Sequence, residues 1–187
     1  MNDNPILGGP TFSLRDRLFR ALWRIAWFTL AAWTPAPLHS WRLQLLRIFG
    51  ANVHPTAKVY GSARIWDPSN LTMSAYSSLG PGVECYCVGP IVLEINVVVS
   101  QRAHLCTGTH DINGPNFSLM ARPIKIKKDA WICAEAFLGP GVTIGEGAVL
   151  AARAVTFRDL APWTVYVGNP AKPAKTRAQF SREYRDQ

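Results

Sequence analysis

The sequence predicts an all-β fold, a parallel β-helix of hexapeptide repeats, preceded by an amphipathic helical segment and closed by a short C-terminal cap. Three observations predict it: a hydrophobic period of six from about Val53 to Phe157, glycine-rich corners inside that period, and a basic, tryptophan-rich segment before it. A chain of 187 residues, 48% of them hydrophobic, can bury one such core. We therefore expect one main domain, 51–160, between an N-terminal segment, 1–50, and a C-terminal basic cap or tail, 161–187.

The repeat places a large aliphatic residue at every sixth position. The clearest run is Ile126, Ile132, Leu138, Ile144 and Leu150; earlier runs are Val53, Val59 and Ile65, then Met73 and Leu79, then Leu93, Val99 and Leu105. A small residue usually follows four places later, which predicts a short strand with an inward aliphatic side chain and then a tight corner. Three such units close one coil, so we expect each aliphatic residue to stack on its equivalent eighteen residues away. The slips between runs predict bulged coils.

The N-terminal segment, residues 14–49, is predicted to be an amphipathic helical element. Its arginines and its apolar residues recur at roughly helical spacing; they are Arg15, Arg17, Arg20, Arg24, Leu18, Leu22, Trp23, Trp27 and Phe28. Its most apolar stretch, Ile25 to Trp33, is too short to cross a membrane, and Pro35 and Pro37 end any helix there. Two interpretations stay open: the segment packs on the flank of the main domain or a neighbouring subunit, or it lies on an anionic membrane surface.

Composition and charge limit the partners. The formal net charge of +8 indicates an anionic partner: nucleic acid, an acidic membrane surface or a phosphorylated small molecule. The arginines alternate with tryptophans at one end, which argues against nucleic acid. The four cysteines lack paired C-x-x-C spacing, and no histidine stands near them in a zinc-finger arrangement, so we predict no metal site. The first residues lack the pattern of a secretory signal, so we expect a cytoplasmic location, peripheral at the inner membrane if the segment binds lipid.

One long insertion interrupts the repeats. The loop 109–124 projects from the coils, and His110 stands at its base. Long loops on a rigid scaffold often carry function, and a neutral imidazole can accept a proton from a hydroxyl group. His110 is therefore the first candidate for a catalytic residue, with an ordinary surface histidine as the alternative.

At these residues the sequence resembles the hexapeptide-repeat acyltransferases. The resemblance rests on Thr109-His110-Asp111, the extruded loop, and the stretches ARIWDPSNLTM, HLCTGTHDINGPNF, WICAEAFLGPGVTIGEGAV and PWTVYVGNPAK, which are similar to the colanic acid biosynthesis acetyltransferases. It covers about residues 50 to 177. It implies a left-handed β-helix, acetyl-CoA as co-substrate, a sugar or glycan-precursor hydroxyl as acceptor, an O-acetyltransferase activity and a homotrimer with sites between subunits.

The resemblance also implies roles for individual residues on the acceptor side. His110 would be the general base that activates the acceptor hydroxyl. Glu84, one coil earlier, would be a carboxylate that orients His110 or binds the acceptor; the alternative is a solvated corner glutamate. Tyr86, Asp111 and Asn116 are the other acceptor-site candidates.

On the donor side, family members bind the pantetheine arm in the groove between adjacent subunits, where small residues let the backbone approach. The matching positions are Trp131, Ala134, Ala152, Phe157 and Arg158, with Lys172 and Lys175 placed to meet the phosphates. Cys133 and Arg153 depart from the family pattern, which puts the width of the groove in doubt. The two lysines could instead belong to a solvated tail.

Two other functions are found on the same kind of scaffold. A β-helix zinc carbonic anhydrase needs three converging histidines, but His54 lies coils away and His104 and His110 fall on different faces of one coil. A non-catalytic scaffold explains the coils but leaves the histidine-bearing loop without a role.

Overall fold

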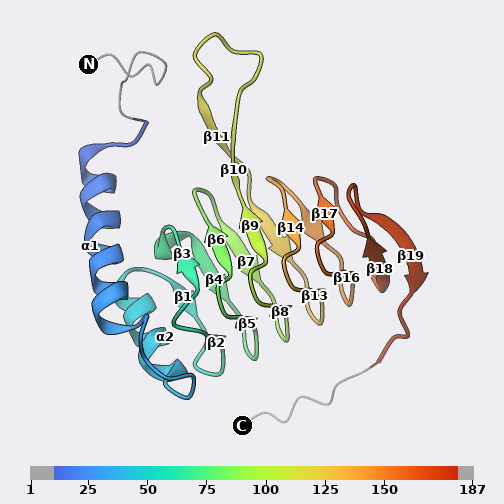
Figure 1. The fold of residues 1–187 in the computed structure, drawn as a ribbon, viewed down its shortest axis with the longest axis horizontal. Helices are drawn as coiled ribbons and strands as arrows, with labels where there is room; N and C mark the ends of the chain where they lie inside the picture. Colours follow the sequence, from blue (N-terminus) through green and yellow to red (C-terminus); the bar gives the residue numbers. More distant parts are fainter. Residues whose placement is uncertain (1–10, 181–187) are drawn as a thin grey trace.

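The predicted left-handed parallel β-helix is confirmed by the computed structural model, which describes residues 11–180 (Figure 1). The two ends of the predicted N-terminal segment and C-terminal cap, residues 1–10 and 181–187, lie outside the described residues. Short strands wind into three sheets that form the three faces of the coil stack.

Each sheet takes one strand from each successive coil. The first sheet has the order β1 (Asn52–Val53), β4 (Leu71–Met73), β7 (Ile91–Leu93), β12 (Ile124–Ile126) and β15 (Thr143–Ile144). The second has β2 (Lys58–Val59), β5 (Ser78–Leu79), β8 (Val98–Val99), β13 (Trp131–Ile132), β16 (Val149–Leu150), β18 (Thr164–Val167) and β19 (Lys172–Thr176). The third has β3 (Arg64–Ile65), β6 (Glu84–Tyr86), β9 (His104–Cys106), β14 (Phe137–Leu138) and β17 (Val155–Thr156).

The core lies along the axis of the stack. All of the aliphatic residues that define the period of six are buried, and the alanines at the fourth place, such as Ala103 and Ala136, are completely buried. Several corners turn through a residue in the left-handed region, for example Asn96, Arg102 and Glu135, with φ near +60°. The chain therefore turns from one face of the coil to the next at each corner, with little room for a side chain inside.

The expected spacing of eighteen residues is found between the coil of β12, β13 and β14 and the coil that follows it, whereas Val149 of the later coil pairs with Val165, sixteen residues on. Lys125 pairs with Thr143 at that spacing, whereas Lys58 pairs with Ser78, two residues further on. The first coil holds its extra residues in the 3₁₀ turn Pro68–Asn70, at the corner where the sequence slips. The inward side chains keep their places because the extra residues bulge outside the coil.

The long insertion is a β-hairpin that projects from the corner between the third and first sheets. Its strands are β10 (Gly108–His110) and β11 (Leu119–Ala121), paired antiparallel (Figure 1). Directly after it, β12 pairs with β7 of the preceding coil, so the stack continues past the hairpin without a gap.

Two helices close the N-terminal end of the stack, α1 (Leu14–Leu30) and α2 (His39–Ile48). In this ladder the N–H groups of one coil donate to carbonyls of the next, for example His54 N–H to Met73 at 2.8 Å, so the carbonyls of the first coil need other donors. The helices supply them. The indole of Trp23 donates to Ile65 at 2.7 Å, and Arg47 donates to Val53 at 2.8 Å.

Arg42 fixes the turn between the helices to the first coil. It is completely buried, and its Nε donates to the Val59 carbonyl at 2.6 Å. Its other nitrogens donate to the Thr34 hydroxyl at 2.7 Å and the Ala36 carbonyl at 2.6 Å. Burial lowers the pKa of Arg42, and the ring of oxygen acceptors offsets the loss of hydration.

At the other end, β18 and β19 form an antiparallel pair that closes the second sheet. Across residues 11–180, no helix is both long and apolar enough to span a membrane.

Candidate active site

The orientation of His110 is set by a backbone carbonyl. His110 is exposed at the end of β10, and its Nδ1 lies 2.6 Å from the carbonyl oxygen of Phe117, across the hairpin. A carbonyl oxygen can only accept, so Nδ1 carries the proton, and in the neutral ring Nε2 keeps its lone pair. The imidazole therefore presents a basic nitrogen away from the hairpin.

The hairpin tip holds Phe117 in place through short-range hydrogen bonds. Asp111 N–H donates to the Ser118 carbonyl at 2.9 Å, and the Asp111 carboxylate accepts from Asn113 N–H at 3.1 Å, an Asx turn. Phe117 itself has a φ of 45°. The predicted acceptor residues Asp111 and Asn116 both belong to this tip, and Asn116 is exposed there.

Tyr86 lies against the first residue of the hairpin. A Cβ built on Gly108 would come within 2.8 Å of Cε1 of Tyr86, so only glycine lets the hairpin begin this close to the ring. Burial raises the pKa of Tyr86, which keeps its hydroxyl neutral and able to donate a hydrogen bond. The structure thus brings Tyr86 to the base of the strand that carries His110.

Glu84 occupies the same outward row as Arg64 and His104 on the third sheet. Its carboxylate lies 3.8 Å from the Arg64 guanidinium. Burial lowers the pKa of His104, and within residues 11–180 its Nε2 has no hydrogen-bond partner. The hydrogen bond at Nδ1 of His110 goes to Phe117 and not to Glu84, so an orienting role for Glu84 stays a prediction.

The predicted donor positions lie along the corner between the second and third sheets. Ala134 and Ala152 occupy this corner on successive coils, joined by the hydrogen bond from Arg153 N–H to the Ala134 carbonyl at 3.0 Å. Trp131 stands just before the corner, 45% exposed, and its indole donates to the Ser100 hydroxyl at 2.8 Å.

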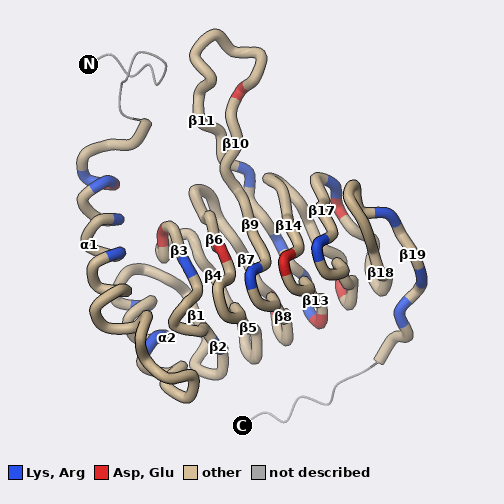
Figure 2. The backbone as a smooth tube through the Cα atoms, in the orientation of Figure 1, with Lys and Arg blue, Asp and Glu red and all other residues tan. Residues whose placement is uncertain are grey.

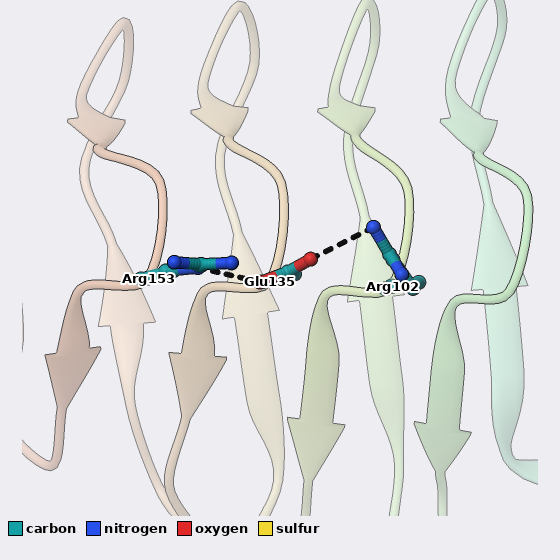
Figure 3. A network of polar contacts seen from close by, with 3 residues as sticks. All are labelled: Arg102, Glu135 and Arg153. Atoms are coloured by element: carbon teal, nitrogen blue, oxygen red, sulfur yellow. Dashed lines mark hydrogen bonds and ion pairs between the residues drawn. The ribbon is translucent and has the colours of Figure 1, made fainter.

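Arg153, one of the departures from the family pattern, is held along this corner (Figure 3). Its Nε lies 2.6 Å from the carboxylate of Glu135, which also accepts from Arg102 at 2.9 Å. The adjacent arginines, first of all the hydrogen bond from Arg153, lower the pKa of Glu135. Cys133, the other departure, is buried, and burial raises its pKa, so it packs as a small neutral side chain.

The remaining donor candidates lie toward the C-terminal end. Phe157 is 65% exposed and packs on Phe137, with ring centres 5.5 Å apart. The backbone N–H of Arg158 donates to the Thr156 hydroxyl at 3.2 Å. Lys172 and Lys175 are exposed on β19, at the end of the stack opposite α1 (Figure 2). Small corner residues, an exposed ring and two cations are compatible with a long, phosphate-bearing donor.

No cluster of three or more histidine, cysteine, aspartate or glutamate residues in the described range 11–180 could hold a metal ion.

Comparison with known proteins identifies the family. No protein-family model matches the chain. The putative colanic acid biosynthesis acetyltransferase WcaF of Escherichia coli (strain K12) is 38% identical over 158 residues, which cover 84% of this chain and 87% of that protein. This chain belongs to the hexapeptide-repeat acetyltransferase family.

Solved members of the hexapeptide-repeat acetyltransferase family share the fold. A maltose O-acetyltransferase from Clostridium difficile 630 superposes with a TM-score of 0.78 at 22% identity, covering 89% of this chain and 90% of that one. A hexapeptide-repeat acetyltransferase of Vibrio cholerae O1 biovar eltor, in complex with acetyl coenzyme A, gives 0.78 at 20% identity, covering 91% and 93%. These structures support the fold, and the 38% identical relative confirms the predicted acyltransferase class.

The sequence did not predict two contacts near the candidate site. The acceptor for His110 Nδ1 is the Phe117 carbonyl, which any residue would carry. Arg20 was noted only as part of a helical stripe, but it lies against Trp66, 46 positions later in the chain. A signal was present in the second case, because an arginine among tryptophans on one helix face often stacks on aromatic rings.

Proposed function

We propose that this protein transfers the acetyl group of acetyl-CoA to a hydroxyl of a sugar or polysaccharide precursor, with His110 as general base. The observation that carries the proposal is the 2.6 Å contact between His110 Nδ1 and the Phe117 carbonyl, since it leaves Nε2 available as a base. The names of the relatives, a colanic acid biosynthesis and a maltose O-acetyltransferase, support a sugar hydroxyl as the acceptor.

In the proposed reaction Nε2 of His110 takes the proton of the acceptor hydroxyl as its oxygen attacks the thioester carbonyl. A new C–O bond forms, and the carbonyl oxygen carries the negative charge of the tetrahedral intermediate. When that intermediate collapses, the C–S bond breaks and the imidazolium returns its proton to the leaving thiolate. Oxygen is acetylated and free coenzyme A departs, so no covalent acyl-enzyme is required.

The other predicted site residues have supporting roles in this proposal. Small side chains at Ala134 and Ala152 would let the pantetheine arm approach the backbone, beside Trp131. Phe157 and Arg158 would contact the adenine end, and Lys172 and Lys175 its phosphates. Tyr86, whose hydroxyl is neutral, would donate to the acceptor together with the Asn116 amide, and the carboxylates of Glu84 and Asp111 would accept from acceptor hydroxyls.

We also propose that the active form is a homotrimer and that it works at the inner surface of the membrane. An apolar row on α1 supports the membrane contact: Leu14, Leu18, Leu22, Ile25 and Phe28 follow helical spacing, and each is at least 59% exposed. The exposed cations Arg15, Arg17 and Arg24 on the same helix favour an anionic lipid surface as the occupant.

Acceptor-dependent thiol release from acetyl-CoA tests the proposed reaction. The protein would be assayed with a panel of monosaccharides, oligosaccharides and sugar phosphates, with acetyl-CoA alone as the control. We expect at least one acceptor to accelerate thiol release and to gain a single acetyl group by mass spectrometry. A protein that does not bind acetyl-CoA would contradict the proposal.

A further inference from the structure

A cleft between α1 and the third sheet is lined by cations. It has a volume of about 960 Å³, and α1 contributes Arg17, Arg20 and Arg24 to its wall. Arg64 comes from β3, and the carboxylate of Glu84 is the acidic group of the lining. This volume is within the range of small-molecule sites, and four arginines against one glutamate favour an anion.

Arg20 is the central residue of this cleft. It is only 9% exposed, and its guanidinium carbon lies 4.0 Å from the centre of the Phe12 ring and 5.2 Å from that of Trp66. Within residues 11–180 the structure gives it aromatic contacts but no hydrogen bond and no carboxylate partner. The guanidinium lines the cleft, so its unused N–H donors are available to an anion there, and its planar fork matches phosphate.

An aromatic path connects Arg20 with the strand that carries His110. The Trp66 ring stands 5.0 Å from that of Tyr86, edge to face, and Tyr86 touches the position of Gly108 at the start of β10. His110 is the last residue of the same short strand. Both rings are half-buried and Trp66 is part of the cleft wall, so a sugar attached to a phosphate at Arg20 would meet an aromatic surface.

We propose that this cleft binds the phosphoryl group of a phosphorylated sugar acceptor, with Arg20 as its main ligand and Trp66 and Tyr86 beneath the sugar. This inference rests on the proposed acetyl transfer and adds a chemical requirement to the acceptor: a phosphate or diphosphate next to the sugar that is acetylated. The phosphate lies far along the stack from Lys172 and Lys175, so the two anions do not compete (Figure 2).

Binding without acetyl-CoA separates this inference from catalysis. The full-length protein would be titrated by calorimetry with glucose, glucose 1-phosphate, UDP-glucose and inorganic pyrophosphate. We expect each phosphate-bearing ligand to bind at least about tenfold more tightly than glucose, and the affinity to fall with salt. A polyprenyl diphosphate sugar in detergent micelles forms a second arm; tighter binding there than for UDP-glucose would identify a lipid-linked source, and the reverse a soluble one.

The variants Arg20→Gln and Arg15→Gln form a matched pair on one helix. Both remove one positive charge, but Arg15 is not part of the cleft wall. We expect Arg20→Gln to weaken pyrophosphate binding at least about tenfold and Arg15→Gln to leave it unchanged. If Arg20→Gln does not fold, the exposed variants Arg24→Gln and Arg64→Gln carry the same test, each with a smaller expected loss.

Equal affinities for glucose and glucose 1-phosphate, or equal losses in the cleft variants and Arg15→Gln, would overturn the inference. Acetylation of neutral sugars with no phosphate binding would leave the proposed function standing without it. Pyrophosphate binding that depends on Arg20, in a protein that acetylates none of the acceptors, would support the cleft and contradict the reaction.

Discussion

At the scale of single residues, two polar contacts have different effects: one orients the candidate base, and the other connects neighbouring coils. His110 uses the Phe117 carbonyl, so its tautomer does not depend on the ionisation of a neighbouring acid. Glu135, in contrast, depends on charged neighbours: its carboxylate pairs with two arginines from different coils at one corner, at 2.6 and 2.9 Å. The first contact serves the proposed chemistry, and the second joins three coils along the proposed donor groove (Figure 3).

Replacing Glu135 by glutamine tests the corner network. Arg153 and Arg102 lower the pKa of this carboxyl, so its charge stabilises the fold above the unfolded pKa. That contribution is lost as the pH falls through the folded value. We expect a small decrease in the thermal unfolding midpoint of Glu135→Gln at pH 7, and a difference from wild type that shrinks as the pH falls through the lowered pKa of Glu135.

Glu146→Gln is the matched control for this measurement, because Glu146 pairs with one lysine, Lys128, at 3.3 Å. Its effect at pH 7 should be the smaller of the two. A difference between wild type and Glu135→Gln that persists unchanged in acid would show that packing, and not charge, connects these coils.

At the scale of elements, α1 has two apolar faces with different tasks. Trp23 and Trp27 are buried and donate to carbonyls of the first coil, at 2.7 Å to Ile65 and 3.0 Å to Ala63. The opposite face carries the exposed row that includes Leu18 and Phe28, at 62% and 76%. The sequence left two interpretations of this segment, packing on the main domain or contact with a membrane. Packing on the domain accounts for the face of Trp23 and Trp27, and the face of Leu18 and Phe28 is left for a partner.

Vesicle flotation tests the proposed partner of the exposed face. Wild type should float with vesicles rich in phosphatidylglycerol and much less with phosphatidylcholine vesicles. Leu18→Glu should reduce partitioning about tenfold, since it removes one buried leucine from the lipid contact. Ile112→Glu, an equally charged change at the exposed hairpin tip, is the control and should float like wild type. Equal flotation of Leu18→Glu and wild type would refute the membrane contact.

At the scale of the whole molecule, the coil stack was predictable and its ends were not. The period of six is visible in the sequence, for example at Ile126, Ile132 and Leu138, because each inward position needs an aliphatic residue and each corner needs a small one. The predicted spacing of eighteen residues was wrong in the early coils because the extra residues at Pro68–Asn70 bulge outward and leave the inward pattern intact. The Trp23 indole that donates to the Ile65 carbonyl of the first coil comes from 42 positions earlier in the chain, and such long-range pairing leaves no local pattern.

The candidate site also has one part that the sequence predicted and another that it did not. The histidine was predictable because a residue type carries the chemistry, and its place at the base of a projecting hairpin follows from the insertion. The Phe117 carbonyl and the ring contacts of Arg20 were not, because they depend on how the hairpin and α1 fold onto the coils.

Light scattering tests the proposed assembly. We expect a molar mass three times that of the 20.7 kDa chain, at concentrations used for the activity assay. Co-assembly of His110→Ala chains with chains blocked in the donor groove by Ala152→Trp should restore part of the activity if sites form between subunits. A monomer that retains full activity would contradict the homotrimer.

The turnover of His110→Ala, measured beside the affinity of the same variant for acetyl-CoA, tests the account most directly. Loss of a positioned general base should lower kcat by about 10²–10⁴-fold, while acetyl-CoA binds with unchanged affinity because the predicted donor groove does not include His110. A variant that keeps kcat within about threefold of wild type would show that His110 is not the base.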